Sequence, residues 1–270
     1  MRILHIGDIV GKPGRRIVVK ALRALVERER LDLVIANAEN AAGGSGLTPE
    51  IYRELIAAGV DGITLGDHIY RRREICDVLE REANIVKPAN YPPQSPGREF
   101  MVLKTRGGEQ VAVVSLMGRV FMRPVDCPFA AADRVLAALP ADMQAIVVDF
   151  HAEATSDKQL MGRYLDGKVS AVLGTHTHVA TADAQIFPRG TAFQCDLGMT
   201  GPHESIIGRR IEPVMEVTRT FFPEHFDVAT GDVRLCGAII EIDPITRRAT
   251  SIRSVCLTEA QVDETIAPPT

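Results

Sequence analysis

The segment Leu33-Val34-Ile35-Ala36-Asn37-Ala38-Glu39-Asn40 is a short apolar run that ends in polar side chains. A run of this length bounded by turn signals predicts a buried strand. The pattern recurs on both sides: residues 3–6 lead into Gly7-Asp8, and residues 63–65 lead into Gly66-Asp67-His68. Residues with helical spacing separate the runs, at 17–26 and from Thr48-Pro49 to about residue 58. This alternation predicts an α/β fold with parallel strands joined by right-handed crossovers.

The second half of the chain continues the pattern with more strands. Apolar runs at 145–149 and 169–173 predict two further strands, and residues 130–139 predict a helix. A following helix is expected to be capped by Thr155 or Ser156. Turn residues between apolar runs predict three hairpins, at 100–103 with 111–117, 185–187 with 192–194, and 235–242 with 249–257.

We therefore expect a single domain over residues 1–270, with central mixed β-sheets flanked by helices. Residues 201–232 are the least regular part, with prolines at 202, 213 and 223. They could form a small cap, an oligomer contact or a long surface loop. The polar tail from Glu259 is expected to fray.

Composition narrows the functional classes. The net charge of −4 gives no reason to expect a stable complex with nucleic acid. Five cysteines, odd in number and without a CxxC pair, indicate a reducing compartment rather than a disulfide framework. No apolar run approaches 18 residues and no signal peptide opens the chain, so we expect a cytoplasmic protein with no membrane segment.

Side chains that can bind metals follow the predicted strands. Because parallel strands end side by side, these residues should share one crevice. Four of these side chains also have a purely structural interpretation. Asp8 could cap a helix, His151 could be a hydrogen-bonded ring, and the His176 and His178 pair could lie in an exposed turn. A carboxylate buried at a strand end is costly without a cation or hydrogen bonds, which favours a metal. The candidate ligands are Asp8, Glu39, Asn40, Asp67, His151, His176 and His178.

This set of ligands predicts the kind of metal site. Oxygen and imidazole ligands without thiolates suit Fe, Mn or Zn, and we expect Fe first. Seven ligands are too many for one tetrahedral ion. Two ions about 3.5–4 Å apart, bridged by a carboxylate, would use them all and would suit phosphoryl transfer. The sequence therefore predicts two metal ions per chain.

Six motifs together resemble the bacterial YmdB-like family of the calcineurin-like metallophosphoesterase superfamily, over nearly the whole chain. They are Ile6-Gly7-Asp8, Ala38-Glu39-Asn40, Gly66-Asp67-His68, the segment 149–156, Gly174-Thr175-His176-Thr177-His178 and the segment 198–202. The resemblance implies the layered metallophosphoesterase fold and a dinuclear phosphodiesterase. Its implied activity is hydrolysis of 2′,3′-cyclic nucleotides by a metal-bridging hydroxide.

The resemblance also implies a role for each ligand. Glu39 would bridge the ions, and His68 would protonate the leaving oxygen as the catalytic general acid. The remaining ligands divide into two sets: Asp8, Asn40 and His178 for one ion, and Asp67, His151 and His176 for the other.

Asp67 departs from the family pattern, which has Asn at this position. With Asp8 and Glu39 it makes three carboxylates, so two divalent ions would leave a formal charge of +1 before any hydroxide. Our hypothesis is that Asp67 tightens metal binding or favours a trivalent ion, and weakens attraction for an anionic ester. The alternative is a single-oxygen ligand whose charge is absorbed by a neighbouring donor.

Two other functions stay open. One is a phosphomonoesterase on the same scaffold, and the other is a regulatory binding protein with a slow or idle site. Expected partners are a small phosphodiester substrate and further copies of the chain in a homo-oligomer. The sequence assigns no substrate-binding residue, although Arg71-Arg72-Arg73 could form a basic rim.

Overall fold

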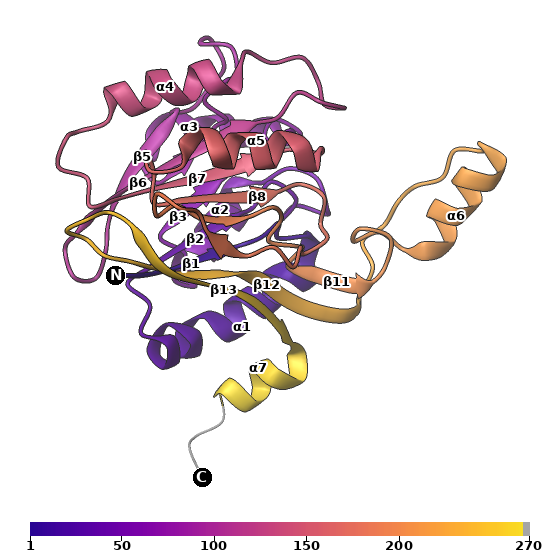
Figure 1. Cartoon of the computed structure of the whole chain (residues 1–270). Helices are drawn as coiled ribbons and strands as arrows, with labels where there is room; N and C mark the ends of the chain where they lie inside the picture. Colours follow the sequence, from indigo (N-terminus) through magenta and orange to yellow (C-terminus); the bar gives the residue numbers. More distant parts are fainter. Residues whose placement is uncertain (267–270) are drawn as a thin grey trace.

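Two mixed β-sheets lie face to face and helices cover their outer faces (Figure 1). This computed structural model describes residues 1–266. The first sheet has the order β11-β12-β1-β2-β3-β4, with β13 paired to β12. Its strands are β1 (Arg2–Ile6), β2 (Leu33–Asn37), β3 (Gly62–Thr64), β4 (Ile85–Val86), β11 (Gly201–Glu204), β12 (Gly231–Ile242) and β13 (Ala249–Thr258).

The second sheet has the order β5-β6-β7-β8-β10-β9. Four of its strands, β6, β7, β8 and β10, run parallel, and antiparallel strands close both edges. Its strands are β5 (Phe100–Lys104), β6 (Gln110–Met117), β7 (Ala145–His151), β8 (Ala171–Thr175), β9 (Gln185–Ile186) and β10 (Ala192–Gln194).

The apolar runs are continuous because their strands are covered on both faces. In β2, Leu33 and Ile35 pack between the two sheets, whereas Val34 and Ala36 pack under the helices. A strand buried on both faces loses the apolar–polar alternation of a solvent-facing strand. The helices over the first sheet are α1 (Gly11–Glu29), α2 (Pro49–Ala57), α3 (Cys76–Arg81) and α7 (Glu259–Ile266); those over the second are α4 (Pro128–Ala138) and α5 (Thr155–Leu165).

Most predicted elements are confirmed. The β-α-β-α-β unit and the three hairpins form as expected, and Thr48 caps α2 by accepting a hydrogen bond from the Ile51 amide at 3.3 Å. The α/β fold with mixed central sheets flanked by helices is also confirmed. The strand ends that form the crevice come from two facing sheets rather than from a single sheet.

Two local predictions were wrong. Neither Thr155 nor Ser156 caps α5, because the cap position is Ala154, which has no capping side chain. The tail does not fray from Glu259: residues 259–266 form α7, whose Val262 is fully buried. Residues 267–270 of that tail lie outside the described part of the chain.

Residues 201–232 contain β11 and a projecting helix, α6 (Ile211–Thr220) (Figure 1). Strand β11 pairs with β12, so the segment begins as part of the first sheet. Helix α6 has no buried residue. The homo-oligomer stays a prediction. Within residues 1–266, no helix combines the length and apolar character needed to cross a membrane.

Candidate metal centre

All eight predicted site residues meet where the parallel strands of the two sheets end. Asp8 follows β1, Glu39 and Asn40 follow β2, and Asp67 with His68 follows β3. The second sheet contributes the imidazoles: His151 is the last residue of β7, and His176 and His178 follow β8. The first sheet therefore supplies the oxygen ligands, and the second sheet supplies the three histidines predicted to bind metal.

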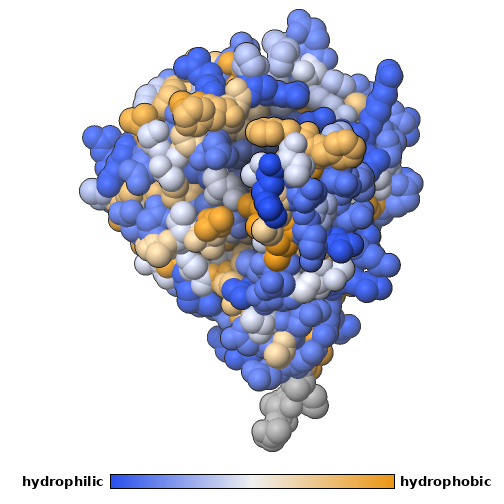
Figure 2. Space-filling model, turned by 90° about the vertical axis from the view of Figure 1, so that its right-hand side faces the viewer, coloured by the Kyte–Doolittle hydropathy of each residue, from blue (hydrophilic) through white to orange (hydrophobic). Residues whose placement is uncertain are grey.

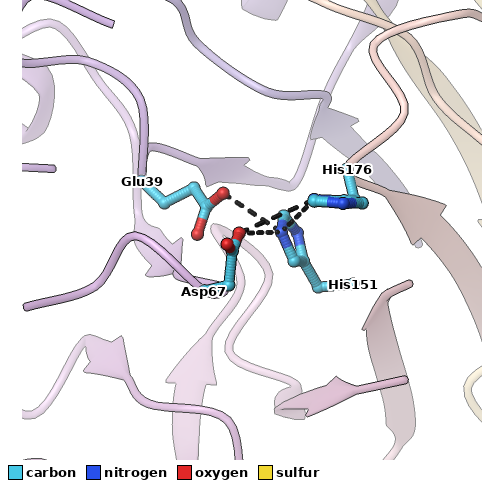
Figure 3. Close-up of side chains that lie close together, drawn as sticks. All are labelled: Glu39, Asp67, His151 and His176. Carbon is cyan, nitrogen blue, oxygen red and sulfur yellow. Dashed lines mark hydrogen bonds and ion pairs between the residues drawn. The ribbon is translucent and has the colours of Figure 1, made fainter. Parts of the chain in front are cut away.

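Glu39, Asp67, His151 and His176 form the tightest group, with one ligand atom from each lying within 4.8 Å of the others (Figure 3). His151 Nε2 lies 3.0 Å from Glu39 Oε1 and 3.2 Å from Asp67 Oδ1. His176 Nδ1 lies 3.0 Å from His151 Nε2 and 3.6 Å from Asp67 Oδ1. This is a compact set of two carboxylates and two imidazoles.

A hydrogen bond at Nδ1, the ring nitrogen that points away from the carboxylates, fixes the orientation of the His151 ring. The Thr175 hydroxyl donates to Asp149 Oδ1 at 2.7 Å, so its oxygen is free to accept from His151 Nδ1 at 2.9 Å. Nδ1 therefore carries a proton, and Nε2 is the ring nitrogen that faces the carboxylates. Asp149 is fully buried and is held in turn by Asn37 and Thr64.

The same arrangement holds at the other two histidines. His176 Nε2 lies 3.2 Å from a carboxylate oxygen of Glu153, which leaves Nδ1 to face the group. His178 donates through Nδ1 to the Ile207 carbonyl at 3.0 Å, which leaves Nε2 to face Asp8 and Asn40. An acceptor on the outer nitrogen and a lone pair on the inner one is the usual arrangement of metal-binding histidine.

Asp8, Asn40 and His178 form a second group that adjoins the first through Glu39. His178 Nε2 lies 3.3 Å from Asn40 Nδ2 and 3.8 Å from Asp8 Oδ1, and Asn40 Nδ2 lies 3.4 Å from Glu39 Oε1. Within the described residues, Asp8 Oδ1 and Asn40 Oδ1 are buried and have no hydrogen-bond partner. Buried acceptors normally have a donor or a cation beside them, so these atoms fit a metal ion.

Burial and neighbouring charges shift the pKa values of the side chains in this site. Burial raises the pKa of Asp8, against the lowering charges of His178 and His151. Burial alone would lower the pKa of His151, but the charge of Glu39 and hydrogen bonds to Asp67 and Glu39 raise it well above its usual value. Burial and the neighbouring His151 lower the pKa of His176 to about 4. The site thus attracts positive charge while His176 stays neutral near pH 7.

His68 lies at the edge of the group. Its amide donates to Glu39 Oε2 at 2.9 Å, and its Nδ1 lies 3.2 Å from Glu39 Oε1. Its side chain is 28% exposed, whereas that of Glu39 is fully buried. Burial lowers the pKa of His68, and the hydrogen bond and charge of Glu39 more than offset this and raise it. His68 therefore touches the central carboxylate while part of its side chain faces solvent.

The loop that carries His176 and His178 is strained and firmly held. Their backbone φ angles are 101° and 65°, in the left-handed region that side chains other than glycine seldom adopt. Between them, Thr177 donates to Asp196 Oδ2 through both its amide and its hydroxyl, at 3.1 and 2.8 Å. The same oxygen accepts from Lys158 Nζ at 2.6 Å, and both charged residues are almost fully buried.

Sequence reasoning missed these supporting residues. Asp196 follows strand β10 just as Asp8 follows β1, so the rule used for the ligands would have marked it. Glu153 stands two residues after His151 in the motif 149–156, but the motif alone assigns it no role. No sequence signal marked Lys158, because it lies on a helix otherwise rich in exposed polar residues.

A cavity of about 960 Å³ lies beside the loop that carries Glu39 and Asn40. Figure 2 shows the face that bears α6, where apolar patches stand among hydrophilic side chains around a hollow. Of the three arginines expected to form a basic rim, Arg72 lines the cavity. Lys12, Arg15 and Arg210 add positive charge, and Glu204, Glu212 and Asp227 add negative charge. Arg15 already has partners within the chain, because its guanidinium donates to the Ala41 carbonyl and pairs with Glu54.

Comparison with known proteins gives one consistent result. Residues 4–255 match the family described as YmdB-like protein. The chain is 44% identical to the 2′,3′-cyclic-nucleotide 2′-phosphodiesterase of Bacillus subtilis (strain 168), over 96% of this chain and 98% of that protein.

Two solved structures share the fold. A hypothetical protein from Thermus thermophilus is 45% identical, with a TM-score of 0.89 over 96% of this chain and all of that one. A structure titled as a novel phosphatase, from Mycoplasma pneumoniae, is 31% identical, with a TM-score of 0.89 over 96% and 93% of the two chains. The family match and these identities cover nearly all of the chain, which therefore belongs to the YmdB-like family.

Proposed function

We propose that this chain is a metal-dependent phosphodiesterase that hydrolyses 2′,3′-cyclic nucleotides. The relative from Bacillus subtilis bears that activity in its name and covers nearly the whole chain. The observation that carries the proposal is the convergence of three imidazole nitrogens on three carboxylates at the strand ends. Such a group is expensive to bury without cations.

We propose two ions rather than one. Glu39, Asp67, His151 and His176 would hold the first, and Asp8, Asn40 and His178 would hold the second, with Glu39 shared. The unpartnered oxygens of Asp8 and Asn40 support the second position, because the first group does not use them. Fe, Mn or Zn fits this donor set, with Fe first.

The ions, when bound, would lower the pKa of water and neutralise charge on the phosphate. The residues of the chain do the rest. Glu39 and the outer partners of the histidines, Thr175 and Glu153, fix the ligand geometry before substrate arrives. Water adds to phosphorus and loses one proton to solvent, the bond from phosphorus to the ribose 2′ oxygen breaks, and His68 gives its proton to that oxygen and regains one from solvent. The product is a nucleoside 3′-phosphate.

One sample tests the proposal. The purified chain is analysed for metal, and the same sample is assayed with 2′,3′-cyclic AMP and with phosphomonoesters. We expect about two transition-metal ions per chain by the ligand count and release of adenosine 3′-phosphate. Hydrolysis of monoesters alone would replace the proposal with a phosphomonoesterase. Stoichiometric metal without turnover on any phosphodiester would support the regulatory binding protein instead.

His68→Ala separates chemistry from metal binding. Loss of a general acid lowers the rate by about 10²–10⁴-fold while the metal content stays that of the wild type. His225→Ala is the matched control, since His225 lies in the exposed segment that follows α6. Loss of metal in the His68 variant would instead make His68 a residue that orients the ligands.

A further inference from the structure

Two cysteines face each other across adjacent strands, away from the metal ligands. Cys236 on β12 is the register partner of Cys256 on the antiparallel β13, and their sulfur atoms lie 3.5 Å apart. Cys236 is fully buried, whereas Cys256 is exposed to solvent. A buried thiol therefore lies in contact with one that small oxidants can reach.

The surroundings make the exposed thiol the reactive one. A hydrogen bond from the Cys236 thiol, helped by the nearby Arg234 guanidinium, lowers the pKa of Cys256 to about 6 against the opposing effect of burial. The same hydrogen bond and burial raise the pKa of Cys236. The thiolate, not the thiol, is the nucleophile, and cationic neighbours favour it. Cys256 is therefore placed to react first and Cys236 second.

His203 is placed to remove the proton from Cys236. Its Nδ1 lies 3.0 Å from the Gly201 carbonyl, which accepts hydrogen bonds only, so the ring proton sits on Nδ1. Its Nε2 then carries a lone pair and lies 3.8 Å from Cys236 Sγ. The pair thus has a nucleophile, a resolving thiol and a base.

We propose that Cys236 and Cys256 are a redox modification site, at which hydrogen peroxide converts the two thiols into a reversible disulfide across β12 and β13. The Cys256 thiolate attacks the peroxide, whose oxygen–oxygen bond breaks to give a sulfenic acid and hydroxide. Cys236 passes its proton to His203 and attacks the Cys256 sulfur, which releases a second hydroxide. With the two thiol protons, both hydroxides become water, so two thiols and one peroxide give one disulfide and two waters.

The other cysteines do not share this arrangement. Among the residues described, Cys236 and Cys256 are the only cysteine sulfurs in contact with each other. Burial raises the pKa of the Cys195 thiol to about 11 and that of Cys76 above its usual value. Oxidation of the chain should therefore be selective.

The backbone of Cys236 lies close to the metal centre. Its amide donates to the Thr200 hydroxyl at 3.0 Å, and its carbonyl accepts from the Gly7 amide at 3.0 Å. The Thr200 amide in turn donates to the Asp8 carbonyl at 2.9 Å. Cys236 is thus hydrogen-bonded to Gly7, the neighbour of the proposed ligand Asp8, and through Thr200 to Asp8 itself.

The test treats the metal-loaded chain with a small excess of hydrogen peroxide, quenches with catalase and blocks free thiols. Trypsin cuts after Arg234, Arg247 and Arg253, so the two cysteines fall in separate peptides, 235–247 and 254–270. We expect these peptides to be joined by a bond that dithiothreitol cleaves, while Cys76 and Cys127 stay free. Peroxide treatment that leaves both thiols alkylatable, or gives only a sulfinic acid at Cys256, would overturn the proposal.

Two variants that keep both cysteines test whether Cys256 is the reactive thiol. Arg234→Gln should slow alkylation of Cys256 at pH 7 by about two- to threefold, because it removes one of the groups that lower the pKa of the thiol while the hydrogen bond from Cys236 remains. Arg253→Gln, on the same strand as Cys256, is the control and should change nothing. In the wild type the alkylation rate should fall as the pH drops through about 6, since the thiolate is then protonated. Equal rates in all three proteins would contradict the assigned nucleophile.

Discussion

Thr177 shows how single residues hold the proposed site in a backbone shape that its sequence does not favour. Both neighbouring histidines have positive φ, which costs about 1–3 kcal/mol for each residue. Asp196 offsets this strain by binding Thr177 through both backbone and side chain. Because Asp196 is buried, it needs the countercharge of Lys158. The two histidines thus depend on an ion pair that neither of them touches.

Lys158→Met tests this support. The change leaves Asp196 as a buried charge without its cation, which should lower the free energy of unfolding by about 3–5 kcal/mol. Urea denaturation followed by circular dichroism measures it. The double variant Lys158→Met with Asp196→Asn removes both charges and should regain part of the loss. If the single variant is as stable as the wild type, the pair does not hold the loop.

The residues of the candidate site were predictable only where they follow an apolar run. Asp8, Glu39 and His151 could be found because a buried strand points each of them to the crevice. Lys158 could not, since nothing in the sequence of a helix tells whether a lysine faces solvent or a buried carboxylate. A residue that acts through another residue has no pattern of its own.

At the scale of elements, Gly174 lets the end of β8 approach the segment after β10. A Cβ atom there would lie 1.7 Å from the Cys195 carbonyl oxygen and 2.6 Å from its carbon, so backbone rather than a flexible side chain stands in the way. The Leu197 amide donates to the Gly174 carbonyl at 2.9 Å and fixes this approach. The close contact places the loop of His176 beside Asp196.

Gly174→Ala should therefore destabilise the chain by about 3 kcal/mol or more, because two backbone segments must move apart. Thermal unfolding measures the change. Gly231→Ala is the control: its added Cβ would lie 3.1 Å from Glu204 Cβ, at an edge with room to shift. Similar losses in the two variants would contradict the close packing at Gly174.

Elements were predictable where they bury a periodic apolar face. Strands β1, β2 and β3 and helix α2 have clear periods or caps, and all of them form. Helix α6 was missed because its sequence contains Pro213 and none of its residues is buried, so no core-facing pattern marks it. Helix α7 was missed because only Val262 anchors it in the core.

At the scale of the whole molecule, the two facing sheets supply different kinds of ligand to the proposed site. One sheet brings the carboxylates and the other brings the imidazoles that are predicted to bind metal, so the ligand set exists only when both sheets are packed together. An unfolded chain offers no such set. Any ion that binds here stabilises the native state by the free energy of its binding.

Metal should therefore raise the unfolding temperature of the whole chain. At a free concentration of about 100 times Kd, each bound ion adds about 2.7 kcal/mol. For a protein of this size each kcal/mol is worth about 2–4 °C, so the transition should rise by about 5–10 °C for each ion, and a chelator should reverse it. Differential scanning calorimetry of the stripped and reloaded protein measures the shift.

Asp67→Asn makes the same experiment specific to the extra carboxylate. Replacing residues that only orient a metal ligand lowers affinity about 10–100-fold, so loss of a charged ligand should do at least as much. At one fixed metal concentration the shift should then shrink by at least about 1.4 kcal/mol, or roughly 3–5 °C. His225→Ala should shift as the wild type does. An equal shift in the Asp67 variant would contradict its proposed role, whereas no shift in any of the proteins would contradict the metal centre itself.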